Sequence, residues 1–307
     1  MNTSEIPWIG ASLGSFAGLT LEQGMELYLR LADDFNLSAV EIRLEREEGR
    51  PSMWSWEVDK KIADFLAKFE VKGAHLPFIY LNLISPNPGI REESRKQLKS
   101  AIAKASELNV DYAVMHATGT AYGLTLEQQT AAWTEVIAEL ADHAEKHSIT
   151  LAVENGDSLA DLKRLAGIVR ATGSKYLKLT LDAGHAYTRT LPHLSTYPVK
   201  ALTLRVLDMT FMPMVIKEYL PFAAYGSLKN FVNIEYELIS AVHVHDFDGK
   251  RAHVAIGDGK MNFSFLSALR ERGFQGPLIL EAEFHDHYQD FKKNYERLQH
   301  FYAGNKG

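Results

Sequence analysis

The feature that most constrains the fold is a repeated alternation between short β-rich runs and longer stretches with helical periodicity. Eight such runs occur, and each is followed by residues that form an apolar face at helical spacing or, after the sixth run, by an irregular segment. The expected strands are Trp8–Gly14, Ala39–Glu45, Val71–Phe78, Asp111–Thr118, Thr150–Gly156, Leu177–Ala183, Ser240–Phe247 and Pro277–Phe284. The expected helices are Leu21–Asn36, Val58–Glu70, Arg91–Asn109, Leu126–His147, Leu159–Ala171, Phe263–Arg272 and Tyr288–Tyr302.

Strands that each return through a helix must run parallel, and eight such units match a closed barrel better than an open sheet. Within Ala39–Glu45, apolar and charged residues alternate. The charged side chains are expected inside the barrel, where Arg43 would pair with Glu41 or Glu45, whereas an open sheet would prefer apolar residues on both faces. The pattern therefore predicts an α/β fold, a (β/α)8 TIM barrel, as a single domain over residues 1–307.

The least regular part of the chain runs from Thr188 to Tyr236 and is apolar and broken by proline. We expect an extended connection between the sixth and seventh strands, which would cover the barrel mouth, cover an oligomer interface or pack as ordinary core. Its apolar stretch Phe211–Phe222 is the expected contact surface if the protein forms a homo-oligomer.

Composition narrows the partners and the metal ligands. The chain has 33 basic and 39 acidic residues, a net charge of −6, and no cysteine. This charge offers no overall attraction to nucleic acid or to an anionic membrane, and the lack of thiols limits metal ligands to imidazole, carboxylate and water. No run is long and apolar enough to span a membrane, and the start MNTSEIPWIG lacks the layout of a secretory signal. We expect a cytoplasmic protein without a membrane partner, for which a nucleic-acid partner would need a local basic groove.

Histidine and carboxylate side chains occur at the C-terminal ends of six consecutive expected strands, the edge where barrels of this kind carry their chemistry. A single such residue is usually buried and hydrogen-bonded, or solvated. Several carboxylates around one barrel mouth are costly unless a cation offsets their charge. These residues are His75, His116, Glu154, Asp182, His185, His243, His245, Asp246, Asp248, His253, Glu281 and Glu283.

The pattern predicts a divalent metal site. The four expected ligands are Glu154, Asp182, His245 and Glu281. Three carboxylates and one imidazole favour Mn²⁺ or Mg²⁺, and Co²⁺ or Zn²⁺ would also bind. His243 shares a strand face with His245 and is expected deeper in the barrel in a structural hydrogen bond, although a shift in register would make it the ligand instead.

A second layer of residues is expected around this metal. His75, His185 and His253 would contact substrate or orient ligands, and His75 with His116 would hold a possible second ion. Trp54 follows the second expected strand, where it would stack on a sugar face or pack the loop.

These residues carry a resemblance that covers nearly the whole chain. The sequence resembles the xylose-isomerase-like (β/α)8 superfamily, which includes sugar isomerases and epimerases, inosose dehydratases and metal-dependent abasic-site endonucleases. The matching segments are GAHLPFIYLNLISPNPGIREESRKQL, VMHATG, LAVENG, LDAGH, HVHDFDGKRAHVAIGDGKMNF and LILEAEF.

The resemblance implies that Glu154, Asp182, His245 and Glu281 are the shared metal ligands. In the epimerase-like branch, the positions of Glu154 and Glu281 also act as the acid/base pair, and the position of His185 contacts substrate. The resemblance thus favours a metal-dependent isomerase or epimerase that moves a proton on a sugar-like polyol carbonyl compound through an enediolate.

The alternatives are an abasic-site endonuclease, an inosose dehydratase-like lyase and a non-catalytic binding barrel. In the endonuclease branch, the positions of His75 and His116 join Glu154 at a second metal. A third metal there is held by the positions of His185, His253 and an aspartate, but Arg251 replaces that aspartate here. This departure and the acidic net charge argue against the endonuclease.

Overall fold

Eight parallel strands form one sheet in the computed structural model, which describes residues 8–45, 60–117, 119, 121, 123–156, 159–188 and 227–304. Each strand lies within or close to the range expected from the sequence. They are β1 (Ile9–Ala11), β2 (Ala39–Arg43), β3 (Val71–His75), β4 (Tyr112–His116), β5 (Thr150–Glu154), β6 (Leu177–Asp182), β7 (Ile239–Val244) and β8 (Leu278–Leu280).

The sheet curls into a nearly closed barrel. Strands pair in the order β1-β8-β7-β6-β5-β4-β3-β2, every pair in parallel. The two end strands meet through a parallel bridge between Ser12 and Glu41 and a hydrogen bond of 3.3 Å from the Ser38 N–H to the Ile9 carbonyl. The predicted (β/α)8 barrel is therefore confirmed.

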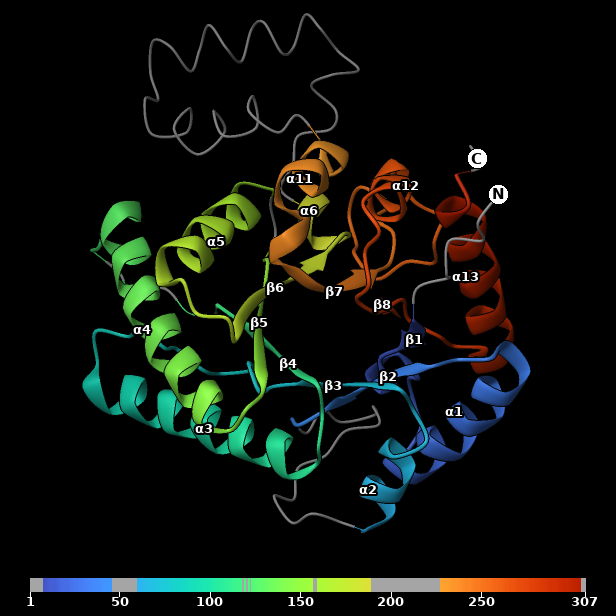
Figure 1. The fold of residues 1–307 in the computed structure, drawn as a ribbon, viewed down its shortest axis with the longest axis horizontal. Helices are drawn as coiled ribbons and strands as arrows, with labels where there is room; N and C mark the ends of the chain where they lie inside the picture. Colours follow the sequence, from blue (N-terminus) through green and yellow to red (C-terminus); the bar gives the residue numbers. More distant parts are fainter. Residues whose placement is uncertain are drawn as a thin grey trace, which may run out of the picture.

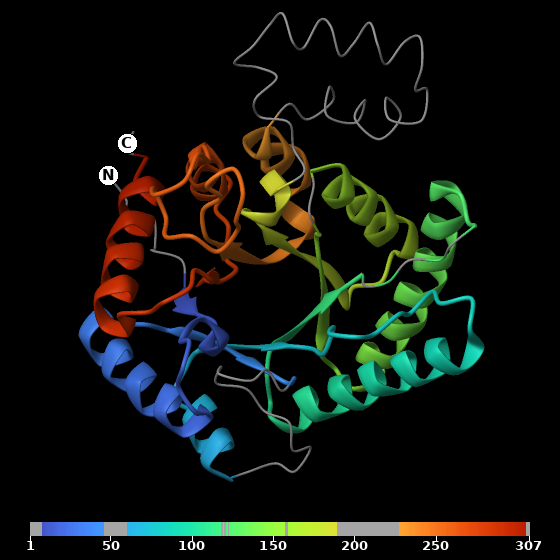
Figure 2. The same ribbon diagram turned by 180° about the vertical axis from the view of Figure 1, so that it is seen from behind.

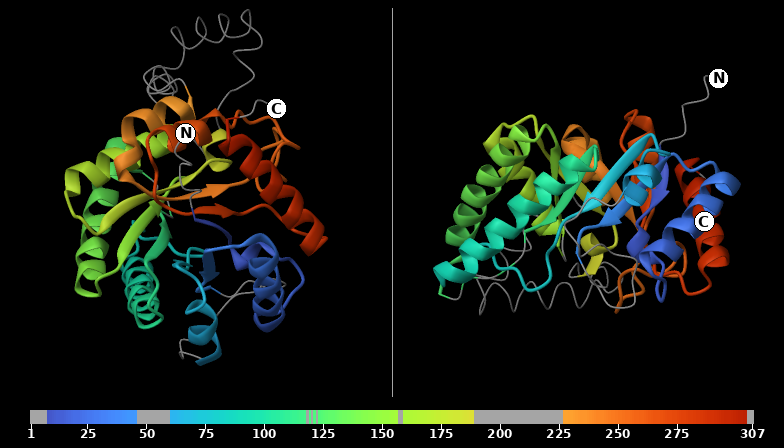
Figure 3. Two further views of the ribbon diagram at one scale, coloured as in Figure 1. Left: turned by 45° about the vertical axis from the view of Figure 1, so that its right-hand side comes forward. Right: turned by 90° about the horizontal axis from the view of Figure 1, so that it is seen from below.

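Helices surround the barrel in chain order, as Figures 1 and 2 show from its two sides and Figure 3 from two further directions. They are α1 (Leu21–Phe35), α2 (Lys60–Leu66), α3 (Pro88–Glu107), α4 (Leu126–Lys146), α5 (Leu159–Thr172), α6 (His185–Thr188), α11 (Leu228–Glu235), α12 (Ser264–Glu271) and α13 (His287–Tyr302). Two short 3-10 turns, η1 (Leu13–Ser15) and η2 (Tyr236–Leu238), follow β1 and α11.

Local sequence explains where several helices begin. Thr20 caps α1 and Thr125 caps α4, each in a capping box with the glutamine three residues later. Helix α3 begins at Pro88, earlier than the expected Arg91, because the Asn87 side chain accepts the Gly89 N–H at 3.0 Å.

The alternation expected in the second strand is confirmed. Val40 and Ile42 of β2 join the large apolar core between strands and helices. The charged side chains of β2 point inward, and Arg43 pairs with Glu45 at 3.9 Å, one of the two expected partners. Glu41 contacts other residues, described below, so β2 delivers a buried carboxylate to the barrel interior.

The connection from β6 to β7 is long, as expected, since β6 ends at Asp182 and β7 begins at Ile239. Most of it, including Phe211–Phe222, lies outside the described residues, as does Trp54, so the expectations for both stay predictions. The extent of the domain over 1–307 likewise stays a prediction. Among the described helices, none has the length and apolar character needed to cross a membrane.

Candidate active site

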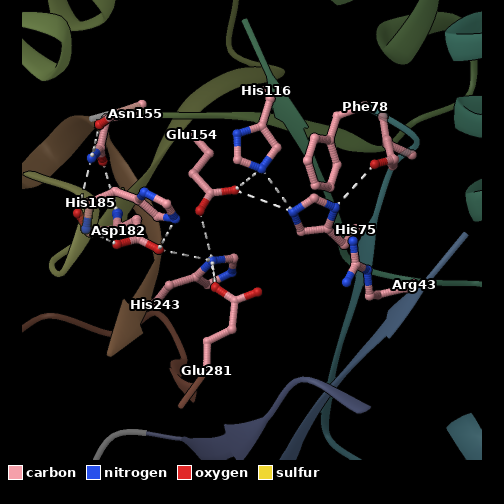
Figure 4. Close-up of polar contacts among 12 residues, drawn as sticks. Arg43, His75, Phe78, His116, Glu154, Asn155, Asp182, His185, His243 and Glu281 are labelled. Atoms are coloured by element: carbon pink, nitrogen blue, oxygen red, sulfur yellow. Dashed lines mark hydrogen bonds and ion pairs between the residues drawn. The ribbon is translucent and has the colours of Figure 1, made fainter. Parts of the chain in front are cut away.

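Four side chains from successive strands meet at the C-terminal end of the barrel. Glu154 ends β5, Asp182 ends β6, His243 lies in β7, and Glu281 follows β8. One ligand atom from each lies within 4.8 Å of the others, and in Figure 4 His243 lies between Glu154 and Glu281. We call these four residues, three carboxylates and one imidazole, the carboxylate group.

His243 contacts every other member of the carboxylate group through one nitrogen. Its Nδ1 lies 2.9 Å from Glu281 Oε2, 3.1 Å from Glu154 Oε1 and 4.0 Å from Asp182 Oδ2. Its Nε2 lies 3.1 Å from Glu41 Oε2 on the opposite side. Three of the four expected ligands are therefore in this group, and its imidazole is that of His243.

His245, the expected imidazole ligand, lies outside the carboxylate group. Its Nδ1 accepts the backbone N–H of His253 at 2.8 Å, so its Nε2 carries the proton and donates to Asp182 at 3.0 Å. The strand register agrees with this placement: Leu179 of β6 pairs with Ile239 of β7, and a shift of one residue between Leu179 and Thr180 then sets Asp182 opposite His243 rather than opposite Val242.

A second group joins the first through Glu154. His116 Nε2 and His75 Nε2 lie 3.0 and 3.3 Å from Glu154 Oε2, and the two nitrogens lie 3.1 Å apart. His75 Nδ1 donates to the Leu76 carbonyl at 3.0 Å, which leaves Nε2 facing the carboxylate. Glu154 Oε2 is buried and accepts no hydrogen bond from the described residues. The structure thus brings together the three residues expected at a second ion.

His185 and His253 form a third contact, beside His245. Their Nε2 atoms lie 3.2 Å apart, and His253 Nδ1 donates to the Glu281 carbonyl at 2.7 Å. The backbone N–H of His185 donates to Asp182 Oδ1 at 2.6 Å. Two of the three expected substrate-binding histidines therefore lie next to the carboxylate group.

Burial and the histidines oppose each other in setting the charges of the carboxylates. Burial raises the pKa of Glu154, but His116 and His243 outweigh it and hold that pKa well below its ordinary value. The pKa of Glu281 is likewise held well below its ordinary value, since His243 outweighs burial, and that of Asp182 is lowered, mainly by His245. The three carboxyls are therefore ionised at neutral pH.

The histidines divide into charged and neutral ones. Burial works against the charged form of His243, but Glu41, Glu281 and Glu154 outweigh it and raise its pKa well above the ordinary value. Burial prevails at His116 and His253 and lowers the pKa of each to about 4. Both imidazoles are consequently neutral at pH 7.

A cavity of about 350 Å³ opens onto these groups. It is lined by six of the expected site residues and by further residues, among them Arg43, Phe78 and Glu283. The six are His75, His116, Glu154, His185, His253 and Glu281. A volume of this order accommodates a small molecule such as a sugar.

Two buried carboxylates near the site have roles that the sequence did not reveal. Asp246 accepts four backbone N–H groups of the loop that carries His253, as detailed below, and Glu41 contacts His243. The sequence did indicate that Glu41 is a charged residue on the inner face of β2. It did not indicate the partner, His243, because this residue lies 202 residues away in the chain.

Comparisons with known proteins agree with this fold. Residues 29–302 match the family described as xylose isomerase-like TIM barrel. The chain is 25% identical over 261 residues to the uncharacterized protein MJ1311 of Methanocaldococcus jannaschii, covering 79% of this chain and 74% of that protein. It is 26% identical over 186 residues to a probable endonuclease 4 of Natranaerobius thermophilus, covering 55% of this chain and 62% of that protein.

Solved structures of low sequence identity share the architecture. A D-tagatose 3-epimerase-like protein superposes with a TM-score of 0.69 at 22% identity, over 96% of this chain and 98% of that one. The IOLI protein with a binding zinc atom gives a TM-score of 0.66 at 16% identity, over 97% and 99%. Together with the family match, these findings show that the chain belongs to the xylose isomerase-like TIM barrel family.

Proposed function

We propose that this protein is a metal-dependent isomerase or epimerase of a sugar or sugar-like polyol carbonyl compound. One observation carries the proposal: Glu281 and Glu154 approach the same nitrogen of His243, at 2.9 and 3.1 Å, and both line the cavity. Reversible proton transfer at a carbon requires a base and an acid close to that carbon, and two carboxylates on either side of the proposed metal site can supply both. The sugar epimerase-like protein among the similar structures supports this choice.

The donor set fits a divalent ion. All ion pairs described for Glu154, Asp182 and Glu281 are with histidines, and no lysine or arginine of the described residues neutralises them. Buried carboxylates at this spacing are otherwise strongly unfavourable. Three carboxylates and one imidazole suit Mn²⁺, Mg²⁺, Co²⁺ or Zn²⁺.

Glu154, Asp182, His243 and Glu281 would hold this ion, with His243 in place of the expected His245. Both ring nitrogens of His245 already have partners, since Nε2 donates to Asp182 and Nδ1 accepts the backbone N–H of His253. His75, His116 and Oε2 of Glu154 would hold a second ion. The structure of a similar protein with a bound zinc atom supports metal binding in this fold.

The residues of this chain then divide the chemistry. A bound divalent ion supplies polarisation of the substrate carbonyl, which makes the neighbouring C–H more acidic. One of Glu154 and Glu281 would remove that proton to give an enediolate, and the other, after taking up a proton from solvent, would return a proton to the carbon. His75, His185, His253 and Trp54 would hold substrate hydroxyls or a sugar face.

The proposal is tested with Glu154→Gln and Glu281→Gln, which keep the shape of each side chain and remove its proton-accepting charge. On a ketose that the wild type converts in D2O, we expect each variant to lose at least about a hundredfold in turnover and in deuterium uptake. The control is Glu283→Gln, a carboxylate at the cavity whose side chain is 44% exposed. Wild-type turnover in both active-site variants would refute the assignment.

A second candidate, a metal-dependent abasic-site endonuclease, is favoured by one observation. Glu154 is shared between two candidate metal groups, as a two-metal hydrolase requires, and a relative is named a probable endonuclease 4. Arg251 argues against it, because this residue replaces the aspartate expected at a third metal. Its side chain is exposed, and its Nε lies 3.4 Å from Asp248 Oδ2. Nicking of a duplex with one abasic site, absent in Glu154→Gln, would establish this activity instead.

A further inference from the structure

Glu41 is a fully buried carboxylate below the carboxylate group, and the proposed chemistry does not use it. It lies on the inner face of β2, and its Oε2 contacts His243 Nε2 at 3.1 Å. The same oxygen accepts the hydroxyl of Tyr112 in β4 at 3.1 Å. We propose that Glu41 and Tyr112 are positioning residues that orient His243 so that its Nδ1 faces the metal. This inference rests on the metal site of the proposed function.

The partners of His243 determine which of its two nitrogens keeps a hydrogen when a cation binds. A carboxylate oxygen accepts, and the Tyr112 hydroxyl already points its hydrogen at Glu41 Oε2. The nitrogen of His243 that faces this oxygen must therefore carry a hydrogen. In the metal-free protein Nδ1 also carries a hydrogen, since it faces Glu281 and Glu154. A cation among Glu154, Asp182 and Glu281 would replace that hydrogen and take the Nδ1 lone pair, whereas Nε2 keeps its hydrogen bond to Glu41.

The barrel wall is shaped to permit this contact. Register places Glu41 of β2 opposite Gly73 of β3, and Gly73 opposite Tyr112 of β4. The tyrosine ring crosses the position of the missing side chain: a Cβ on Gly73 would lie 2.4 Å from Tyr112 Cζ and 2.5 Å from its hydroxyl oxygen. A larger residue at this position would push the ring away from Glu41, so Gly73 keeps the path to Glu41 open.

The contact is also isolated from solvent. Glu41 and His243 are each 0% exposed and Tyr112 is 4% exposed. Since no water reaches this contact, only the side chain at position 41 can face His243. Glutamine keeps one oxygen there but removes the negative charge that strengthens the hydrogen bond to Nε2. A carboxylate that accepts from a metal-binding imidazole typically changes metal affinity by 10- to 100-fold on mutation.

The test measures Zn²⁺ affinity of the full chain by competition with a chromophoric chelator. We expect Glu41→Gln to weaken Zn²⁺ binding by about 10- to 100-fold and Tyr112→Phe by roughly threefold to tenfold. The matched controls are Glu45→Gln, a buried carboxylate of the same strand region that binds backbone N–H groups, and Tyr28→Phe, a buried tyrosine that bonds only backbone atoms. Both controls should stay within about twofold of the wild type.

A second readout reports on His243 itself. Nitrogen-15 NMR of the Zn²⁺-loaded wild type should show a hydrogen-bonded Nε2–H on His243, shifted or lost in Glu41→Gln. A structural role alone would lower the melting temperature of the metal-free protein without changing this signal or the Zn²⁺ affinity. If Glu41→Gln does not fold, Tyr112→Phe against Tyr28→Phe decides the question with the same two measurements.

Three results would overturn the inference. The first is unchanged Zn²⁺ affinity in folded Glu41→Gln and Tyr112→Phe, and the second is a Zn²⁺-loaded His243 that carries its hydrogen on Nδ1. The third is a wild-type protein that binds no Zn²⁺. If His243 then still shows a hydrogen-bonded Nε2–H, the proposed metal site is wrong, whereas the contact between Glu41 and His243 exists.

Discussion

Replacing Asp246 by asparagine should unfold the loop that carries His253, although the two side chains have nearly the same shape. Asp246 is 1% exposed, and each of its oxygens accepts two backbone N–H groups. Oδ1 accepts from Phe247 at 2.7 Å and Met261 at 3.1 Å, and Oδ2 accepts from Gly257 and Gly259, both at 2.9 Å.

The magnitude follows from this count. Asparagine keeps one oxygen, so whichever way the amide turns, its NH2 group opposes two backbone N–H groups. Hydrogen bonds to a charged group contribute about 1.5–3 kcal/mol each, so two lost bonds should lower the free energy of unfolding by roughly 3–6 kcal/mol. Asp246→Ala should cost at least as much, because it removes all four bonds.

Urea denaturation followed by circular dichroism measures this loss, and limited proteolysis locates it in the loop. The matched control is Asp248→Asn, in the same loop, whose side chain is 29% exposed and accepts the Lys250 and Arg251 N–H groups at 2.7 and 2.8 Å. Water can replace those bonds, so the control should lose less than about 1 kcal/mol. A loss below about 1 kcal/mol in Asp246→Asn would show that the reasoning is wrong.

Three further predictions concern single residues. In the metal-free protein, histidine NMR should show His116 and His253 titrating near pH 4, and titration near pH 6.5 would contradict this. Because burial lowers the pKa of His116 from 6.5 to about 4, protonation of this residue favours the unfolded chain. Its contribution to stability should therefore be complete above pH 6.5 and fall as the pH drops to 4. Gly184→Ala would place a Cβ 1.9 Å from His245 Cε1, so it should lower stability by about 1–3 kcal/mol and weaken metal retention, measured by melting and elemental analysis. Tyr28→Phe removes a buried hydroxyl between β1 and β2 and should cost about 1–3 kcal/mol in urea denaturation, whereas an unchanged midpoint would show that this hydrogen bond contributes nothing.

Much of the fold could be predicted because its information is local. Alternation along Ala39–Glu45 showed which side chains face inward, and the structure places Glu41 there with Val40 and Ile42 in the core. Helices α1 and α4 begin at Leu21 and Leu126, as expected from their periodicity, directly after the capping residues Thr20 and Thr125. Parallel strands present their C-terminal ends at one rim, so the convergence of residues from β3 to β8 also followed from their order in the chain.

The choice between His243 and His245 could not be made in this way. The two histidines are two residues apart, in β7 and directly after it, and both contact Asp182. Only the tertiary structure shows that His243 also contacts Glu154 and Glu281. The bulge at Leu179/Thr180 that shifts the pairing of β6 with β7 has no clear sign in the local sequence.

The sequence by itself thus determined the barrel, the rim at which its polar residues gather and the lack of sulfur ligands, since these depend on periodicity, order and composition. Only the tertiary structure decided that His243 rather than His245 lies among the three carboxylates, that Glu154 faces two groups at once and that Glu41 supports His243 from below. The physical reason is that hydrogen-bond directions and distances of about 3 Å depend on strand register and on partners as far as 202 residues apart, which no local pattern records.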